Sequence, residues 1–191
     1  MTGPAIVLIG PMGAGKTSIG KRVAKQLGLR FLDSDAAVVR AHGPIDRIFA
    51  DHGEAHFREL ERTAVAEALR EGGVVALGGG AVLHPETQRD LAEHRVVLLT
   101  VAPHNVAARI RGGKRPLLAD GDAVARWQEI YAARRPIYER LADVVFDTST
   151  GPLQDVADAL AAWVSAAAAA GPAANDSATT DAATTDPGET P

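Results

Sequence analysis

The chain has 191 residues, a length that suits one domain. Apolar residues make up 46 % of it and aromatic residues only 4 %, which predicts a core built mostly from Val, Leu, Ile and Ala. The formal net charge of −4 comes entirely from the stretch after Gly171, which holds four acidic residues and no Lys or Arg. Residues 1–170 carry 20 acidic and 20 basic side chains, and this balance argues against general binding to nucleic acid or to a membrane surface.

Cysteine is absent, which excludes a disulfide framework and a thiolate metal site and fits a reducing compartment. The apolar runs, such as residues 5–9, are too short for a secretion signal or a membrane span. We therefore expect a cytoplasmic protein with one domain over residues 1–170. Residues 171–191 lack large apolar side chains, so we expect them to form a disordered acidic tail.

Strand-like apolar runs alternate with helical patterns along the chain. Strands are predicted at residues 5–9, 31–32, 74–77, 96–101 and 144–146, and the first is apolar on both faces, as a buried parallel strand is. Helices are predicted at residues 16–27, 60–69, 85–93, 105–110, 122–138 and 153–164, with Gly28 ending the first and Pro136 interrupting or bending the fifth. This alternation predicts an α/β fold with a parallel sheet.

A phosphate-binding loop is predicted between the first strand and the first helix. Residues 10–17 read Gly-Pro-Met-Gly-Ala-Gly-Lys-Thr and match G-x-x-x-x-G-K-[ST] at every fixed position. The glycines let backbone N–H groups converge on phosphate oxygens. Lys16 would place its charge on the β- and γ-phosphates, and the Thr17 hydroxyl is a hard ligand suited to Mg²⁺. An accidental match in a chain of this length has a chance below about one in a hundred.

The loop alone leaves kinases, GTPases, ATPases and nucleotidyl enzymes open. A GTPase would carry a DxxG switch and a base-reading N/T-K-x-D motif, and neither occurs in this sequence. Motor-type ATPases usually need a longer chain and a strand that ends in adjacent acidic residues, which is also missing. Kinases of small molecules remain.

Two acidic residues, Asp33 and Asp35, follow the second strand at the end where ligands bind in open α/β sheets. On an extended segment they would point the same way, one toward the Mg²⁺ hydration shell and the other toward a substrate hydroxyl. An acidic turn or a helix cap is an equally good interpretation. The triple glycine at residues 78–80 could let a ligand approach the backbone or could be a flexible turn.

These segments, taken together and in this order, resemble the shikimate kinase family. The resemblance runs from about residue 6 to about residue 148. Beside the phosphate loop it is carried by five short motifs: Leu-Asp-Ser-Asp at 32–35, Phe-Arg at 57–58, Leu-Gly-Gly-Gly-Ala at 77–81, Arg-Pro-Leu-Leu at 115–118 and Arg-Arg-Pro-Ile-Tyr at 134–138.

The resemblance implies a three-layer P-loop kinase fold. A five-stranded parallel sheet would lie between helices, with a helical substrate-binding segment after Asp35 and a mobile lid around Gly112 and Gly113. The activity implied is transfer of the ATP γ-phosphoryl group to the 3-hydroxyl of shikimate, within aromatic amino acid (chorismate) biosynthesis. Mg²⁺ would be the cofactor and ATP the co-substrate of a monomer that binds neither nucleic acid nor membrane.

The resemblance also assigns residues. Catalytic roles would fall to Asp35, Lys16 and Arg115, with Asp35 hydrogen-bonding the accepting hydroxyl and acting as its base. Shikimate would be bound by Asp35, Arg58, Gly79 and Arg134, the two arginines clamping its carboxylate. ATP would be bound by Gly13, Ala14, Gly15, Lys16, Thr17, Ser18 and Arg115. Thr17 would ligate Mg²⁺, and Asp33 would hold it through water.

Two alternatives remain at this stage. Gluconate kinase has a similar scaffold and also acts on a polyhydroxy acid, although the paired aspartates, the triple glycine and Arg134 favour shikimate. A nucleotide-binding regulatory module without catalysis is the second, and the intact set of Lys16, Thr17, Asp33, Asp35 and Arg115 argues against such decay.

Overall fold

The structure is a computed structural model that describes residues 3–110 and 122–169, with the side chains of 107–110 left out. Three sequence predictions therefore lie outside the described residues. These are the lid around Gly112 and Gly113, the phosphate contact of Arg115, and the tail at residues 171–191.

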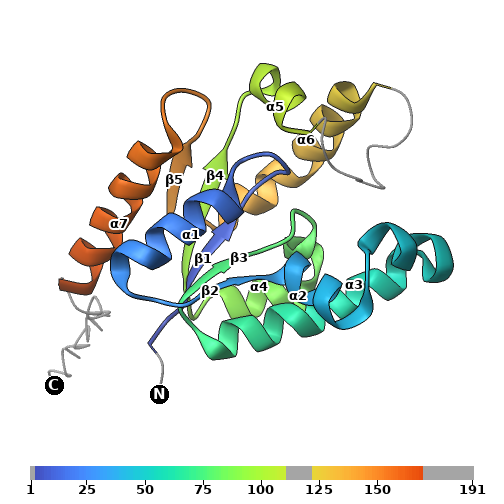
Figure 1. The fold of residues 1–191 in the computed structure, drawn as a ribbon, viewed down its shortest axis with the longest axis horizontal. Helices are drawn as coiled ribbons and strands as arrows, with labels where there is room; N and C mark the ends of the chain where they lie inside the picture. Colours follow the sequence, from blue (N-terminus) through green and yellow to red (C-terminus); the bar gives the residue numbers. More distant parts are fainter. Residues whose placement is uncertain (1–2, 111–121, 170–191) are drawn as a thin grey trace, which may run out of the picture.

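Five parallel strands form one sheet in the order β2-β3-β1-β4-β5 (Figure 1). They are β1 (Ile6–Ile9), β2 (Phe31–Asp33), β3 (Val74–Ala76), β4 (Arg95–Thr100) and β5 (Val144–Asp147). Each strand begins and ends within one residue of its predicted position. The prediction of a five-stranded parallel sheet is confirmed.

Seven α-helices and one short 3₁₀-helix connect the strands in the described part of the chain. They are α1 (Lys16–Leu27), α2 (Ser34–His42), α3 (Ile45–Glu71), η1 (Ala81–Leu83), α4 (Pro85–Leu91), α5 (Pro103–Ile110), α6 (Ala123–Leu141) and α7 (Leu153–Ala169). Gly28 ends α1 in the left-handed conformation, as predicted.

Helices α3, α6 and α7 extend beyond their predicted ranges, α7 by five residues to Ala169. Helix α3 joins the predicted helix at 60–69 to a preceding segment across a kink at Gly53, whose φ of 81° is outside the helical range. Helix α6 runs through Pro136 to Leu141, so the predicted interruption is wrong. A proline removes one backbone hydrogen bond from a helix, and the buried side chains of Arg134 and Tyr138 on either side hold the flanking turns in place.

The helices cover both faces of the sheet, which makes three layers (Figure 1). Side chains of β1 alternate between the two faces. Ile6 and Leu8 pack into a core shared with α1 and α7, whereas Val7 and Ile9 pack into a second core shared with α3 and α4. No helix in the two described ranges is long and apolar enough to cross a membrane.

The chemistry-bearing loops follow three neighbouring strands of this sheet. The phosphate loop follows β1, Asp33 is the last residue of β2, and residues 78–80 come just after β3. Because β2, β3 and β1 are adjacent and parallel, their carboxyl ends meet at one edge of the sheet. The fold thus brings together residues that lie up to about seventy positions apart in the sequence.

Candidate active site

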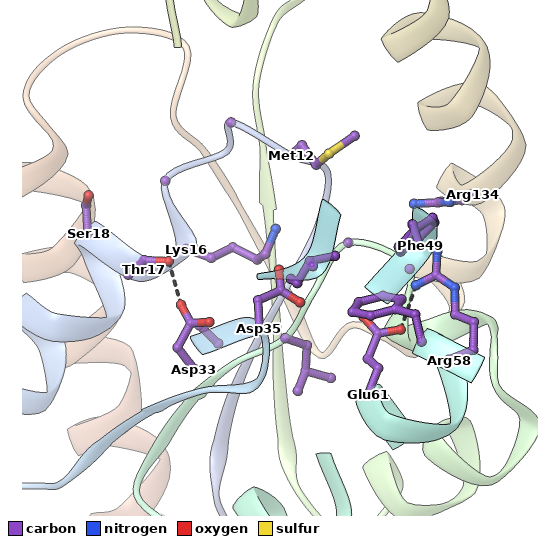
Figure 2. Close-up of a pocket in the computed structure, with 18 of the residues that line it drawn as sticks. Met12, Lys16, Thr17, Ser18, Asp33, Asp35, Phe49, Arg58, Glu61 and Arg134 are labelled. Carbon is purple, nitrogen blue, oxygen red and sulfur yellow. Dashed lines mark hydrogen bonds and ion pairs between the residues drawn. The ribbon is translucent and has the colours of Figure 1, made fainter. Parts of the chain in front are cut away.

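A cavity of about 620 Å³ opens at the carboxyl ends of the strands. Ten of the residues predicted for the site line it: Gly13, Gly15, Lys16, Thr17, Ser18, Asp33, Asp35, Arg58, Gly79 and Arg134. Figure 2 shows Lys16, Thr17 and Asp33 at one end, Arg58 and Arg134 at the other, and Asp35 between them. Ala14 belongs to the same loop, but its side chain is fully buried in the core.

The phosphate loop takes its shape from glycines with positive φ. Gly10, Gly13 and Gly15 have φ values of 132°, 82° and 88°, which other residues rarely adopt. At Gly10 a Cβ would also lie 2.2 Å from the carbonyl oxygen of Leu99. The ammonium of Lys16 donates to the carbonyls of Gly10 at 2.8 Å and Pro11 at 3.0 Å, so its charge lies across the loop.

Asp33 connects the phosphate loop to the next helix. Its Oδ2 accepts a hydrogen bond from Thr17 Oγ1 at 2.7 Å, and its Oδ1 accepts from the backbone N–H of Ala36 at 3.1 Å. The second contact caps α2, which begins at Ser34. The predicted extended segment from Asp33 to Asp35 is therefore wrong: Asp35 lies in the first turn of a helix, and only the cap interpretation describes the backbone correctly.

Asp35 is held in a setting that favours its protonated form more than water does. Burial raises the pKa of Asp35 above its ordinary value, and the nearby carboxylate of Asp33 raises it further. The positive charges of Lys16 and Arg58 oppose this rise. A carboxylate with a raised pKa is a better proton acceptor, and this one faces the middle of the cavity (Figure 2).

Glu61 was not found by sequence reasoning, although it orients one of the predicted arginines. Arg58 Nη1 donates to Glu61 Oε2 at 2.6 Å and Nη2 donates to Glu54 Oε1 at 2.8 Å. Glu61 is only 2 % exposed, and burial raises the pKa of its carboxyl while Arg58 lowers it. The spacing of Glu54, Arg58 and Glu61 places the three on one helix face, and this was the available signal.

Two glycines of the triplet, Gly78 and Gly80, are required by the side chains around them, whereas a Cβ on Gly79 would meet nothing closer than 3.7 Å. A Cβ on Gly78 would lie 2.4 Å from both Asp35 Oδ1 and Glu61 Oε1. A Cβ on Gly80 would lie 2.2 to 2.6 Å from the guanidinium atoms of Arg58. Both distances are far below van der Waals contact. These glycines therefore allow two carboxylates and one arginine to approach the backbone at the Arg58 end of the cavity.

Gly80→Ala is expected to displace Arg58 without unfolding the protein, because Gly80 has φ −100° and ψ −10°, which alanine adopts readily. We expect the KM for the acceptor substrate to rise about 10- to 100-fold, the size of a lost charged hydrogen bond. The affinity for MgADP should not change. The control is Gly3→Ala, since a Cβ at Gly3 meets nothing within 4 Å. An unchanged KM in Gly80→Ala would show that Arg58 does not bind the acceptor.

The donor set at the phosphate end fits a hard cation. Thr17 Oγ1 and Asp33 Oδ2 are oxygen atoms that lie 2.7 Å apart at the edge of the cavity. No group of three or more acidic or histidine side chains that could hold a metal occurs among the described residues. Mg²⁺ usually needs only one or two protein oxygens together with substrate phosphates and water, so this pair suits it.

Comparison with known proteins agrees with this geometry. The family model described as "Shikimate kinase" matches residues 12–165. The chain belongs to the shikimate kinase family. It is 45 % identical over 167 residues to the shikimate kinase of Thermobifida fusca, with 86 % of this chain and 96 % of that protein covered. As a member of this family it is an ATP-dependent kinase, as predicted from the sequence.

Solved structures of this family have the same fold. The shikimate kinase from Acinetobacter baumannii in complex with shikimate superposes with a TM-score of 0.82 at 33 % identity, covering 87 % of this chain and 95 % of that one. A gluconokinase from Sinorhizobium meliloti superposes with a TM-score of 0.60 at 21 % identity, covering 89 % and 97 %. The latter likeness is one of fold alone.

Proposed function

We propose that the chain transfers the ATP γ-phosphoryl group to the 3-hydroxyl of shikimate, giving shikimate 3-phosphate and ADP for aromatic amino acid biosynthesis. One observation carries the proposal: a single cavity has a phosphate loop at one end, two arginines at the other and Asp35 between them. Membership of the shikimate kinase family supports the choice of acceptor.

The reaction depends mainly on positioning and charge stabilisation, because phosphoryl transfer passes through a loose transition state. Asp35 aligns the acceptor hydroxyl and takes its proton. Lys16 neutralises charge on the phosphoryl oxygens. The nucleotide phosphates bind along the loop from Gly13 to Ser18, where backbone N–H groups and the start of α1 favour anions.

Mg²⁺ completes the proposed phosphate site. Thr17 would ligate the ion directly and Asp33 would hold it through a water molecule, a division supported by their shared hydrogen bond. When bound, the ion neutralises charge on the phosphate oxygens. Asp33 is fixed for this role by its cap on α2, which keeps its carboxylate from turning away from Thr17.

Shikimate occupies the opposite end in this proposal. Arg58 and Arg134 bind its carboxylate, and the backbone at Gly79 contacts its ring hydroxyls. Arg134 is only 9 % exposed, which favours a strong interaction with an anion. Phe49 and Phe57 supply an apolar wall for the carbon ring.

Further parts of the proposal rest on the sequence. Arg115, in the Arg-Pro-Leu-Leu motif, would reach the ATP phosphates from a lid around Gly112 and Gly113 that excludes water. We place the kinase domain at residues 1–170 and treat 171–191 as a dispensable acidic tail. We also propose that the chain is active as a monomer. The absence of cysteine is compatible with the cytoplasm.

The test is ADP release with ATP and Mg²⁺, with shikimate, gluconate and AMP offered in separate reactions. Strong dependence on shikimate alone is the expected result. Turnover with gluconate alone would support the kinase activity and show that shikimate is not the acceptor. Binding of ATP without turnover of any acceptor would support the regulatory alternative.

A further inference from the structure

Helix α6 carries four large side chains on one face, and three of them contact the loops that enclose the cavity or line it. Trp127, Tyr131, Arg134 and Tyr138 follow one another at spacings of three and four residues, which places them along one side of a helix. Trp127 and Tyr138 are each 1 % exposed. Arg134 lines the cavity, whereas neither Trp127 nor Tyr138 does.

Trp127 contacts the phosphate loop from α6, outside the cavity lining. Its indole Nε1 donates to the carbonyl of Met12 at 2.9 Å, across 115 positions of sequence. A buried indole N–H needs an acceptor in any protein, so the contact could serve packing alone. The acceptor here, however, is a peptide of the loop that receives phosphate, and Met12 itself lines the cavity.

Peptide geometry gives this contact a consequence for the nucleotide. The described residues contain no cis peptide bond. In a planar trans peptide the C=O and the N–H point in opposite directions. Because Trp127 holds the carbonyl of Met12, the N–H of Gly13 in the same peptide is directed away from α6. Gly13 lines the cavity, in a loop whose N–H groups meet phosphate oxygens.

Tyr138 makes the corresponding contact with the glycine loop at residues 78–80. Its hydroxyl donates to the carbonyl of Gly79 at 2.5 Å, which directs the N–H of Gly80 away from α6. Burial raises the pKa of Tyr138 to about 12, against the opposing positive charge of Arg134. The hydroxyl therefore keeps its proton through the neutral range and remains a donor.

We propose that α6 acts as a strut with two separate positioning residues, Trp127 for the nucleotide phosphates and Tyr138 for the acceptor substrate. Trp127 orients the phosphate loop at Met12, and Tyr138 orients the glycine loop at Gly79. The identity of the two ligands rests on the proposed function. Neither residue lines the cavity, so Trp127 acts through the Met12 peptide, and Tyr138 acts through the Gly79 peptide and through its side-chain hydrogen bond with Arg134.

Trp127→Phe and Tyr138→Phe test this, because the first loses the indole N–H, the second loses the hydroxyl that contacts Gly79 and Arg134, and both keep an aromatic ring. The two readouts are the Kd for MgADP without acceptor, by calorimetry, and the KM for shikimate at saturating ATP. We expect Trp127→Phe to weaken MgADP about 3- to 10-fold and leave the shikimate KM within about twofold. Tyr138→Phe should do the reverse, so each variant is the control for the other.

If the folded variants change the Kd for MgADP and the KM for shikimate in any other way, the proposed roles of Trp127 and Tyr138 are wrong. The same holds if thermal stability falls while both constants stay unchanged. The MgADP measurement needs no acceptor, so the Trp127 result stands even where the wild-type enzyme uses an acceptor other than shikimate. Failure of the proposed function would instead show as a wild-type chain that does not turn over shikimate.

A measurement on the intact chain covers the case in which Trp127→Phe does not fold. The chain has two tryptophans, and Trp163→Phe assigns their indole N–H signals in an NMR spectrum. Trp163 lies on α7, outside the cavity lining. We expect the Trp127 signal to shift with MgADP and not with shikimate alone, because phosphate binding polarises the peptide that it contacts. No shift at saturating MgADP would contradict the proposal.

Discussion

Asp35→Asn should lower kcat about 10²- to 10⁴-fold, the usual contribution of a positioned general base, while leaving MgADP affinity close to that of the wild type. The amide keeps the shape of the carboxylate but cannot accept the proton of the acceptor hydroxyl. The measurement is steady-state turnover with shikimate, paired with calorimetry for MgADP. The control is Asp51→Asn, an exposed aspartate on α3 away from the cavity. Unchanged turnover would remove Asp35 from the mechanism.

The same variant should be more stable than the wild type at neutral pH. Burial and the Asp33 charge raise the pKa of Asp35 above its ordinary 3.8, so ionising it costs free energy in the folded state. Below that ordinary value the side chain is protonated in both states and the cost is absent. The cost appears as pH rises through the raised pKa, and asparagine never incurs it. The Tm advantage of Asp35→Asn should therefore be present at pH 7 to 8 and vanish near pH 3, at about 2–4 °C for each kcal/mol removed.

This pairing of lost activity with gained stability would identify Asp35 as a residue kept for chemistry. An ordinary surface aspartate would change neither quantity. A buried structural aspartate with satisfied partners would lose stability on substitution. Thermal unfolding at three pH values separates these cases.

Much of the fold could be predicted because it depends on local patterns. The apolar runs within Val74–Ala76 and Arg95–Thr100 are buried on both faces, as strands of a covered parallel sheet are. Phosphate-loop residues follow a fixed spacing that backbone geometry imposes. The unbroken course of α6 through Pro136 could not be predicted in this way, because Tyr138 beyond the proline is held by distant segments, including Gly79.

The sequence predicted those residues of the candidate site that belong to recognisable motifs and missed the others. Asp33 is the helix cap that the sequence left open, since Oδ1 caps α2, and its role at Mg²⁺ stays a prediction while Oδ2 accepts from Thr17. Glu61 was missed because a charged residue on a helix is normally exposed, and only the tertiary fold shows that this one is buried. The contacts of Trp127 and Tyr138 with two glycine loops span 115 and 59 positions, distances that no local pattern encodes.

Lys16→Met should be the other severe variant, with kcat lowered about 10²- to 10³-fold, the usual cost of losing one donor to developing charge. Methionine has a similar length but no charge and no N–H. Loss of the Lys16 ammonium also removes its hydrogen bonds to the carbonyls of Gly10 and Pro11, so MgADP affinity should fall as well. Lys21→Met, an exposed position on the same helix, is the matched control and should leave both quantities unchanged.

Lys16→Met should also change the pH dependence of the activity that remains. In the wild type, the positive charge of Lys16 lowers the pKa of Asp35, against the upward effects of burial and Asp33. Removing that charge lets the pKa of Asp35 rise further, so a larger fraction of enzyme carries a protonated, inactive Asp35 at any given acidic pH. The acid limb of kcat/KM against pH, which reports the free enzyme, should therefore move to higher pH in Lys16→Met. An acid limb in its wild-type position would mean that Lys16 acts on the nucleotide alone and that a group other than Asp35 titrates in the free enzyme.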